Sequence, residues 1–76
     1  MIILRDFLNN RDLSRHRTLR NAILAKRKHA ARLEKAHPGS FISYVFWHEL
    51  AGAAIDASTV EKVEHEIILQ KILQRN

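Results

Sequence analysis

The pattern of hydrophobic and polar positions divides the chain into four apolar segments separated by short polar breaks. The segments cover residues 2–9, 12–36, 41–55 and 58–75. In the second and the last segment, apolar residues recur at spacings of three and four, which is the period of an amphipathic helix. The breaks are Asn9-Asn10, His37-Pro38-Gly39-Ser40 and Asp56-Ala57-Ser58, and their residues favour turns and helix caps.

We interpret all four segments as helices, because the alternation of β-branched residues that marks strands is not evident. The first segment alone also fits a strand. The sequence therefore predicts an all-α fold, a compact bundle of three to four helices. With 76 residues, the chain forms one domain at most.

Segment 12–36 predicts a helix with one basic side. At 100° per residue, its apolar stripe contains small residues such as Ala22 and Ala30. The opposite side and one flank are basic, and basic side chains can neutralise phosphates. The candidate nucleic-acid contacts are Arg17, Arg20, Asn21, Arg27, Lys28, Arg32 and Lys35.

The last two segments predict the core and a surface for association. Segment 41–55 is apolar on nearly all sides, which is typical of a buried central helix. Trp47 is then either a core residue or the anchor of a partner groove. In segment 58–75, the pair Ile68 and Ile72 lies about 100° around the helix from the pair Leu69 and Leu73, so a monomer cannot easily cover both pairs. We therefore expect a homodimer. In the alternative, this helix packs between the helices of the first and third segments. The candidate interface is Trp47, Ile68, Leu69, Ile72 and Leu73.

Charge separates the chain into a basic half, residues 1–37, and an apolar, acidic half, residues 38–76. The first half has ten Lys or Arg and three acidic residues, a formal charge of +7. The second has three basic and five acidic residues, a formal charge of −2. This asymmetry predicts that the first half meets an acidic partner, while the second half folds or self-associates.

The residues that could carry catalysis or bind a metal do not form a known pattern. There is no cysteine, and no two of the five histidines are three or four positions apart. Ser14 and His16 would diverge on a helix, and the chain's two glycines cannot form a phosphate-binding loop. We expect no enzymatic activity, no metal and no cofactor.

No segment is long and apolar enough for a transmembrane helix or a signal peptide. We therefore expect an intracellular protein, cytoplasmic or nucleoid-associated, with a mitochondrial location as the alternative. A membrane partner is not expected, because the apolar stripe of segment 12–36 has small residues where lipid-binding helices have large ones.

Residues 49–64 resemble the helix-turn-helix pattern of small repressors, in which an apolar residue follows the turn and Ser or Thr opens the recognition helix. The resemblance would make the last segment a recognition helix, but its glutamates would repel phosphate. The basic helix is therefore the better candidate. The sequence predicts a small regulatory or architectural protein that binds DNA or RNA. The alternative is an inhibitor or adaptor that docks its basic helix and aromatic residues on an acidic protein surface.

Overall fold

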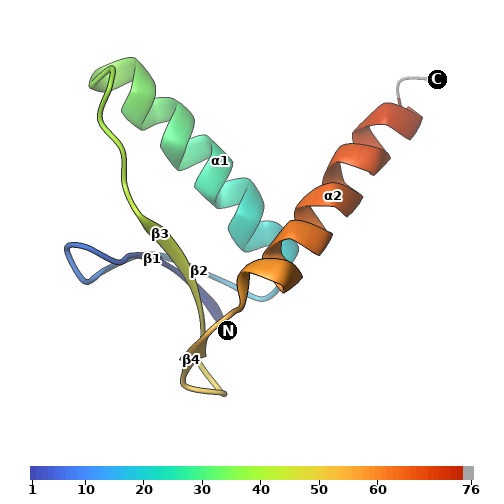
Figure 1. Ribbon diagram of the computed structural model, residues 1–76, viewed down its shortest axis with the longest axis horizontal. Coiled ribbons are helices and arrows are strands. Elements are labelled where there is room, and N and C mark those ends of the chain that lie inside the picture. The colour runs from blue at the N-terminus through green and yellow to red at the C-terminus, as the bar shows by residue number, and fades with distance from the viewer. Residues whose placement is uncertain (75–76) are drawn as a thin grey trace.

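The structure, a computed structural model, describes residues 1–74 and combines helices with an antiparallel sheet (Figure 1). The elements in chain order are β1 (Ile2–Asp6), β2 (Arg11–His16), α1 (Leu19–Ala36), β3 (Tyr44–His48), β4 (Ala53–Ala54) and α2 (Ala57–Gln74). The strand order in the sheet is β2-β1-β3-β4, and all neighbouring strands are antiparallel. The fold is therefore α+β, and the prediction of an all-α helical bundle is wrong.

The first sixteen residues form a β-hairpin rather than helical segments. Asn10 has a positive φ of 51°, a conformation that Asn adopts readily in tight turns. The preceding carboxylate, Asp6, accepts hydrogen bonds from the backbone N–H and the side-chain amide of Asn9. Thus the break at Asn9-Asn10 is the hairpin turn. The strand alternative for the first segment is confirmed, and the helix predicted from residue 12 is wrong up to residue 18.

Helix α1 begins where Thr18 caps it and ends before the proline-glycine break. The Oγ1 atom of Thr18 accepts a hydrogen bond from the backbone N–H of Asn21 at 3.1 Å, which satisfies a free donor at the helix start. Gly39 has a φ of +86° in the turn that follows the helix, a conformation favoured by glycine. The helix prediction is therefore confirmed for residues 19–36.

The segment predicted as a central helix, residues 41–55, contains β3 and β4. Tyr44–His48 consists of aromatic residues, a valine and a histidine, and aromatic and β-branched side chains fit the pleated surface of a strand. Gly52 has a φ of +62° between the strands, which turns the chain back on itself. A short apolar run fits either a strand or a helix segment, and periodicity alone does not separate the two. The helix prediction here is wrong.

Helix α2 starts at Ala57, one residue before the predicted start at Ser58. The Asp56 carboxylate accepts hydrogen bonds from the hydroxyls of Ser58 and Thr59. These bonds, with that from Ser58 the largest cause, lower the pKa of Asp56. The helix prediction is confirmed as far as Gln74, while its predicted last residue, Arg75, lies outside the described residues.

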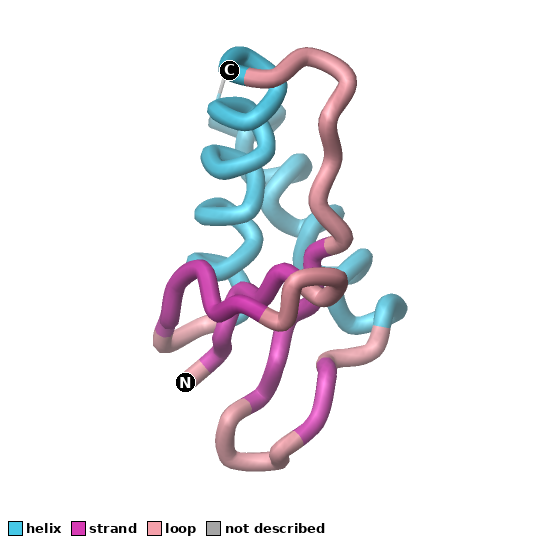
Figure 2. Tube along the Cα trace, turned by 90° about the vertical axis from the view of Figure 1, so that its left-hand side faces the viewer, coloured by secondary structure: helices cyan, strands magenta, loops and turns pink. Residues whose placement is uncertain are grey.

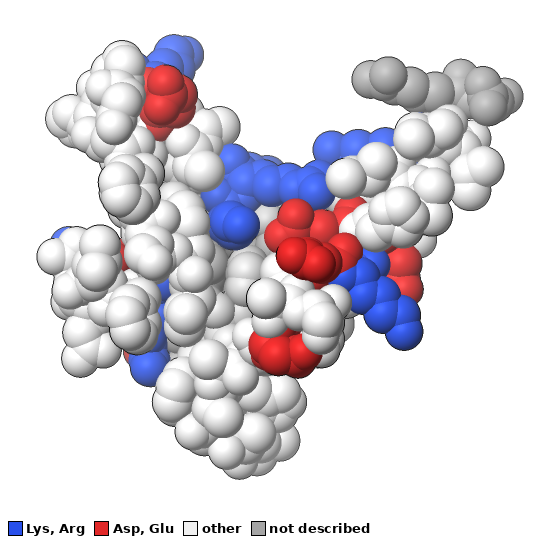
Figure 3. Space-filling view, in the orientation of Figure 1, with Lys and Arg blue, Asp and Glu red and all other residues white. Residues whose placement is uncertain are grey.

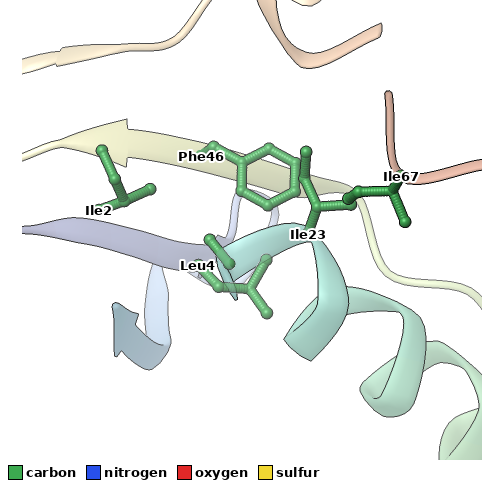
Figure 4. Packing of buried hydrophobic residues seen from close by; sticks show 6 residues of the cluster. Ile2, Leu4, Ile23, Phe46 and Ile67 are labelled. Carbon is green, nitrogen blue, oxygen red and sulfur yellow. The ribbon is translucent and has the colours of Figure 1, made fainter. Parts of the chain in front are cut away.

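Both helices lie on one side of the sheet (Figure 2), and the core fills the space between them and the strands. Its members are Ile2, Leu4, Ala22, Ile23, Phe46 and Ile67. Figure 4 shows Ile23 between Phe46 and Ile67, so α1 connects the sheet to α2. Beyond this core the helices diverge (Figure 1). Within residues 1–74, neither helix has a stretch apolar enough to cross a membrane.

Candidate nucleic-acid interface

The outer face of α1 gathers five of the seven basic or polar residues predicted as nucleic-acid contacts. Ala22 and Ile23 are completely buried, which fixes how the helix is rotated about its axis. The opposite side points to solvent. The residues exposed there are Asn21, Lys28, Arg32 and Lys35. Together with Arg17, which is exposed just before the helix, we call them the outer face. Arg17 lies two residues before α1, and the other four lie within the helix.

The other two predicted contacts, Arg20 and Arg27, lie on a flank of α1. They are seven positions apart and so share one side of the helix. The Nη2 atom of Arg20 donates a hydrogen bond to Oε1 of Gln70 in α2 at 3.2 Å, and Arg27 is half-buried. This flank faces the angle between the helices, so the two arginines are separated from the outer face.

Several basic side chains away from the outer face are neutralised by carboxylates. The pairs are Arg5 with Asp12 at 2.8 Å, Arg15 with Glu49 at 2.7 Å and Lys26 with Glu64 at 4.0 Å. Over residues 1–74, no ion pair involves the basic residues of the outer face. Their charge is therefore available to an acidic partner, which long-range attraction would bring to this side of the molecule.

The two helices differ in charge. Helix α1 contains six Lys or Arg and one Glu, a formal charge of +5, whereas α2 contains two Lys and three Glu, a formal charge of −1. In Figure 3, Lys and Arg atoms form a band across the angle between the helices, and Asp and Glu atoms gather at the start of α2.

The element before α2 is β4, so the resemblance of residues 49–64 to a helix-turn-helix does not extend to the structure.

Trp47 lies on the face of the sheet that the helices leave open. Its neighbour Phe46 points into the core, and successive residues of a strand point to opposite faces. The guanidinium carbon of Arg5 lies 4.7 Å from the centroid of the Trp47 ring, within the range of a cation–π interaction. The predicted partner interface therefore divides into two parts, because Trp47 is on the open sheet face and the other members are on the exposed end of α2. Those members are Ile68, Leu69, Ile72 and Leu73.

A groove between α1, β3 and α2 was not predicted from the sequence. Its volume is about 320 Å³, and Lys26, Phe46 and Val60 are among the residues that line it. The Nζ atom of Lys26 lies 5.9 Å from the ring centroids of both Phe46 and Tyr44. A cationic ligand would compete with Lys26 for these rings, so we assign no ligand to the groove. Burial raises the pKa of Tyr44, whose hydroxyl lies 2.7 Å from Nδ1 of His29.

Ser14 and His16 come together on β2, contrary to the prediction that they diverge. That prediction assumed a helix, whereas residues two apart on a strand share a face. The Ser14 Oγ and His16 Nε2 atoms are 2.7 Å apart. A nucleophilic serine also needs a group that orients its base, and the side-chain hydrogen bonds within residues 1–74 supply none to His16. We assign this pair no catalytic role.

The described residues also offer no cluster of metal ligands. Within residues 1–74, no three His, Asp or Glu side chains are placed so that they could hold a metal ion.

Comparisons of the chain with protein-family models, curated proteins and solved structures find no match.

Proposed function

We propose that this protein binds nucleic acid through the outer face of α1. The observation that carries the proposal is the row of exposed basic side chains without an ion pair in the described structure, from Arg17 to Lys35. At a rise of 1.5 Å per residue, the part of the outer face within α1, from Asn21 to Lys35, is about 21 Å long. Such a row can contact several phosphates and release their counterions, which is the main source of affinity for nucleic acids.

The geometry of α1 suits contact along its length. The C-terminal end of α1 lies far from α2 (Figure 1), and the major groove of duplex DNA, about 12 Å wide, admits a single helix. Asn21 lies on the same face as the basic residues, and an asparagine amide can pair with the edge of an adenine. The outer face therefore combines phosphate contacts with one side chain suited to base recognition.

The alternative function, docking on an acidic protein, combined the basic helix with aromatic anchors. Trp47 lies on the open face of the sheet, under the guanidinium of Arg5, while both helices lie on the opposite side of the sheet (Figure 2). A single protein surface would have to reach around the molecule to contact both. The separation favours a ligand that needs mainly a row of positive charge, as a nucleic acid does.

Replacing two lysines of the outer face tests the proposal. The Lys28→Glu/Lys35→Glu variant places acidic groups at two exposed positions seven residues apart, and the carboxylate introduced at position 28 would have Arg32 as an i+4 partner that supports the helix. We expect its affinity for a labelled random duplex and for a labelled single-stranded RNA to fall at least about tenfold, since phosphate contacts are lost and repulsion is added. Fluorescence anisotropy at about 50 mM salt measures both affinities.

The matched control is Lys62→Glu/Lys71→Glu, which alters two exposed lysines of α2. Both double variants lower the formal net charge from +5 to +1, because each Lys→Glu change removes two charges. A site on α1 predicts a large loss in the first variant and a small loss in the control. Equal losses would show a response to net charge alone, and no binding by the unaltered protein would refute the proposal.

A further inference from the structure

The second half of α2 exposes a contiguous set of large aliphatic side chains. Only Ile67 is buried between Ala57 and Gln74, at 2% exposure. The residues that follow are turned away from the core. We call them the α2 apolar end: Ile68, Leu69, Ile72 and Leu73, with exposures of 47%, 45%, 54% and 72%. A contiguous exposed apolar surface of this kind marks a site of interaction.

The monomer also has more surface than a compact protein of its size. Its accessible surface is 5830 Å², whereas a compact monomer of 8.8 kDa exposes roughly 4800 Å². The radius of gyration is 13.2 Å, against roughly 11 Å for a compact chain of this length. The excess of about 1000 Å² is close to the roughly 800 Å² that each partner buries in a stable protein–protein interface.

The charge around the α2 apolar end suits a second copy of the same chain. Residues 65–74 contain one acidic and one basic residue, Glu66 and Lys71. In a two-fold symmetric interface each patch meets itself, so a strongly charged surface would repel its copy. The outer face of α1, with four basic residues that form no ion pair within residues 1–74, fails this requirement, while the α2 apolar end meets it.

We infer that two copies of the protein associate through the α2 apolar ends. In each copy Ile68 and Ile72 form one ridge and Leu69 and Leu73 form another, about 100° away around the helix. The partner's α2 lies along the space between these ridges, so both become covered at once. This inference rests on the exposed apolar surface and does not depend on the proposed nucleic-acid binding. It assigns Trp47 no part in the interface.

Sedimentation of the full chain from about 1 to 300 µM tests the dimer, because the dissociation constants of standard-size interfaces extend up to the micromolar range. We expect the protein to sediment as a dimer at the upper end of that range. The Ile68→Lys/Ile72→Lys variant should raise the dissociation constant at least about tenfold, because lysine ammonium groups would be desolvated in the interface. Lysine is favourable near a helix C-terminus, so circular dichroism should show the helices intact.

The matched control is Leu50→Lys, which changes an aliphatic residue that is 90% exposed but lies outside α2. Its dimer should be unchanged. If the double variant loses helicity, Leu73→Lys and an inter-chain disulfide from Leu69→Cys, in a chain with no other cysteine, give the same answer. A protein that stays monomeric up to about 300 µM, or a dimer that neither lysine variant weakens, would overturn the inference.

Discussion

Replacing Ile67 by alanine is the sharpest test of how α2 is held to the rest of the molecule. Ile67 is 2% exposed and belongs to the same buried cluster as Ile23 and Phe46. Its neighbour Ile68 is 47% exposed. The two residues have the same side chain, lie in the same helix and are adjacent in sequence. They therefore differ mainly in whether the side chain enters the core.

The expected cost of Ile67→Ala is about 3 kcal/mol, within the range of 2 to 5 kcal/mol for removing a buried Ile or Leu side chain. A chain of 76 residues has a total stability of roughly 4 to 11 kcal/mol, so the variant loses a large part of it. Ile68→Ala should change stability by no more than about 0.5 kcal/mol in the monomer, since its side chain is half in water already.

Urea unfolding followed by circular dichroism measures both variants, at protein concentrations where sedimentation shows a monomer. With a slope of about 1.5 kcal/mol per molar urea, Ile67→Ala should lower the midpoint by about 2 M. Equal losses of stability in the two variants would contradict the orientation of α2, in which Ile67 faces the core and Ile68 faces solvent. A midpoint for Ile67→Ala within about 0.3 M of the unaltered protein would refute the core assignment.

Single replacements also test the hairpin, the start of α1 and the open sheet face. The hydrogen bond from the Asn9 side chain is the largest cause of the lowered pKa of Asp6. The ionised Asp6 therefore stabilises the fold above pH 3.8, the ordinary pKa of an aspartate side chain. This contribution is lost as the pH falls from 3.8 through the lowered pKa of the folded state. Asn9→Ala should flatten this part of the pH profile of urea midpoints, and superimposable profiles would contradict the role of the bond. Thr18→Ala should cost about 1 kcal/mol by removing the cap of α1, a loss that thermal unfolding detects and that Thr18→Ser should largely avoid. Arg5→Ala should make the single tryptophan, Trp47, more accessible to acrylamide; unchanged quenching would exclude the stacking.

The helices could be predicted from the sequence, whereas β1 was the one strand that the sequence suggested, and only as an alternative to a helix. Helices α1 and α2 have long periodic patterns, and that period is a local property. Strands β1 and β3 are five residues long and pair across the sequence, with Ile3 opposite Trp47. Short apolar runs of this length fit either a helix or a strand. The pairing that decides between them depends on residues far away in the sequence.

The candidate site was predictable to the extent that it depends on one helix. The buried side of α1, marked by Ala22 and Ile23, follows from helical period, so its exposed basic side could be identified. The ion pair of Lys26 with Glu64 and the hydrogen bond of Arg20 to Gln70 depend on how α2 packs. No local pattern reveals them. They decide which basic residues remain available to a ligand.

The salt dependence of nucleic-acid binding tests the central claim most directly. Four basic residues on the outer face, Arg17, Lys28, Arg32 and Lys35, predict that raising the salt from about 50 to 200 mM weakens binding about 150-fold for duplex DNA and about 50-fold for a single strand. Fluorescence anisotropy of the unaltered protein with both labelled ligands gives these ratios. We predict a loss of affinity of about this size for at least one of the two ligands. Binding that changes less than about threefold, or no binding at about 50 mM, would contradict the account.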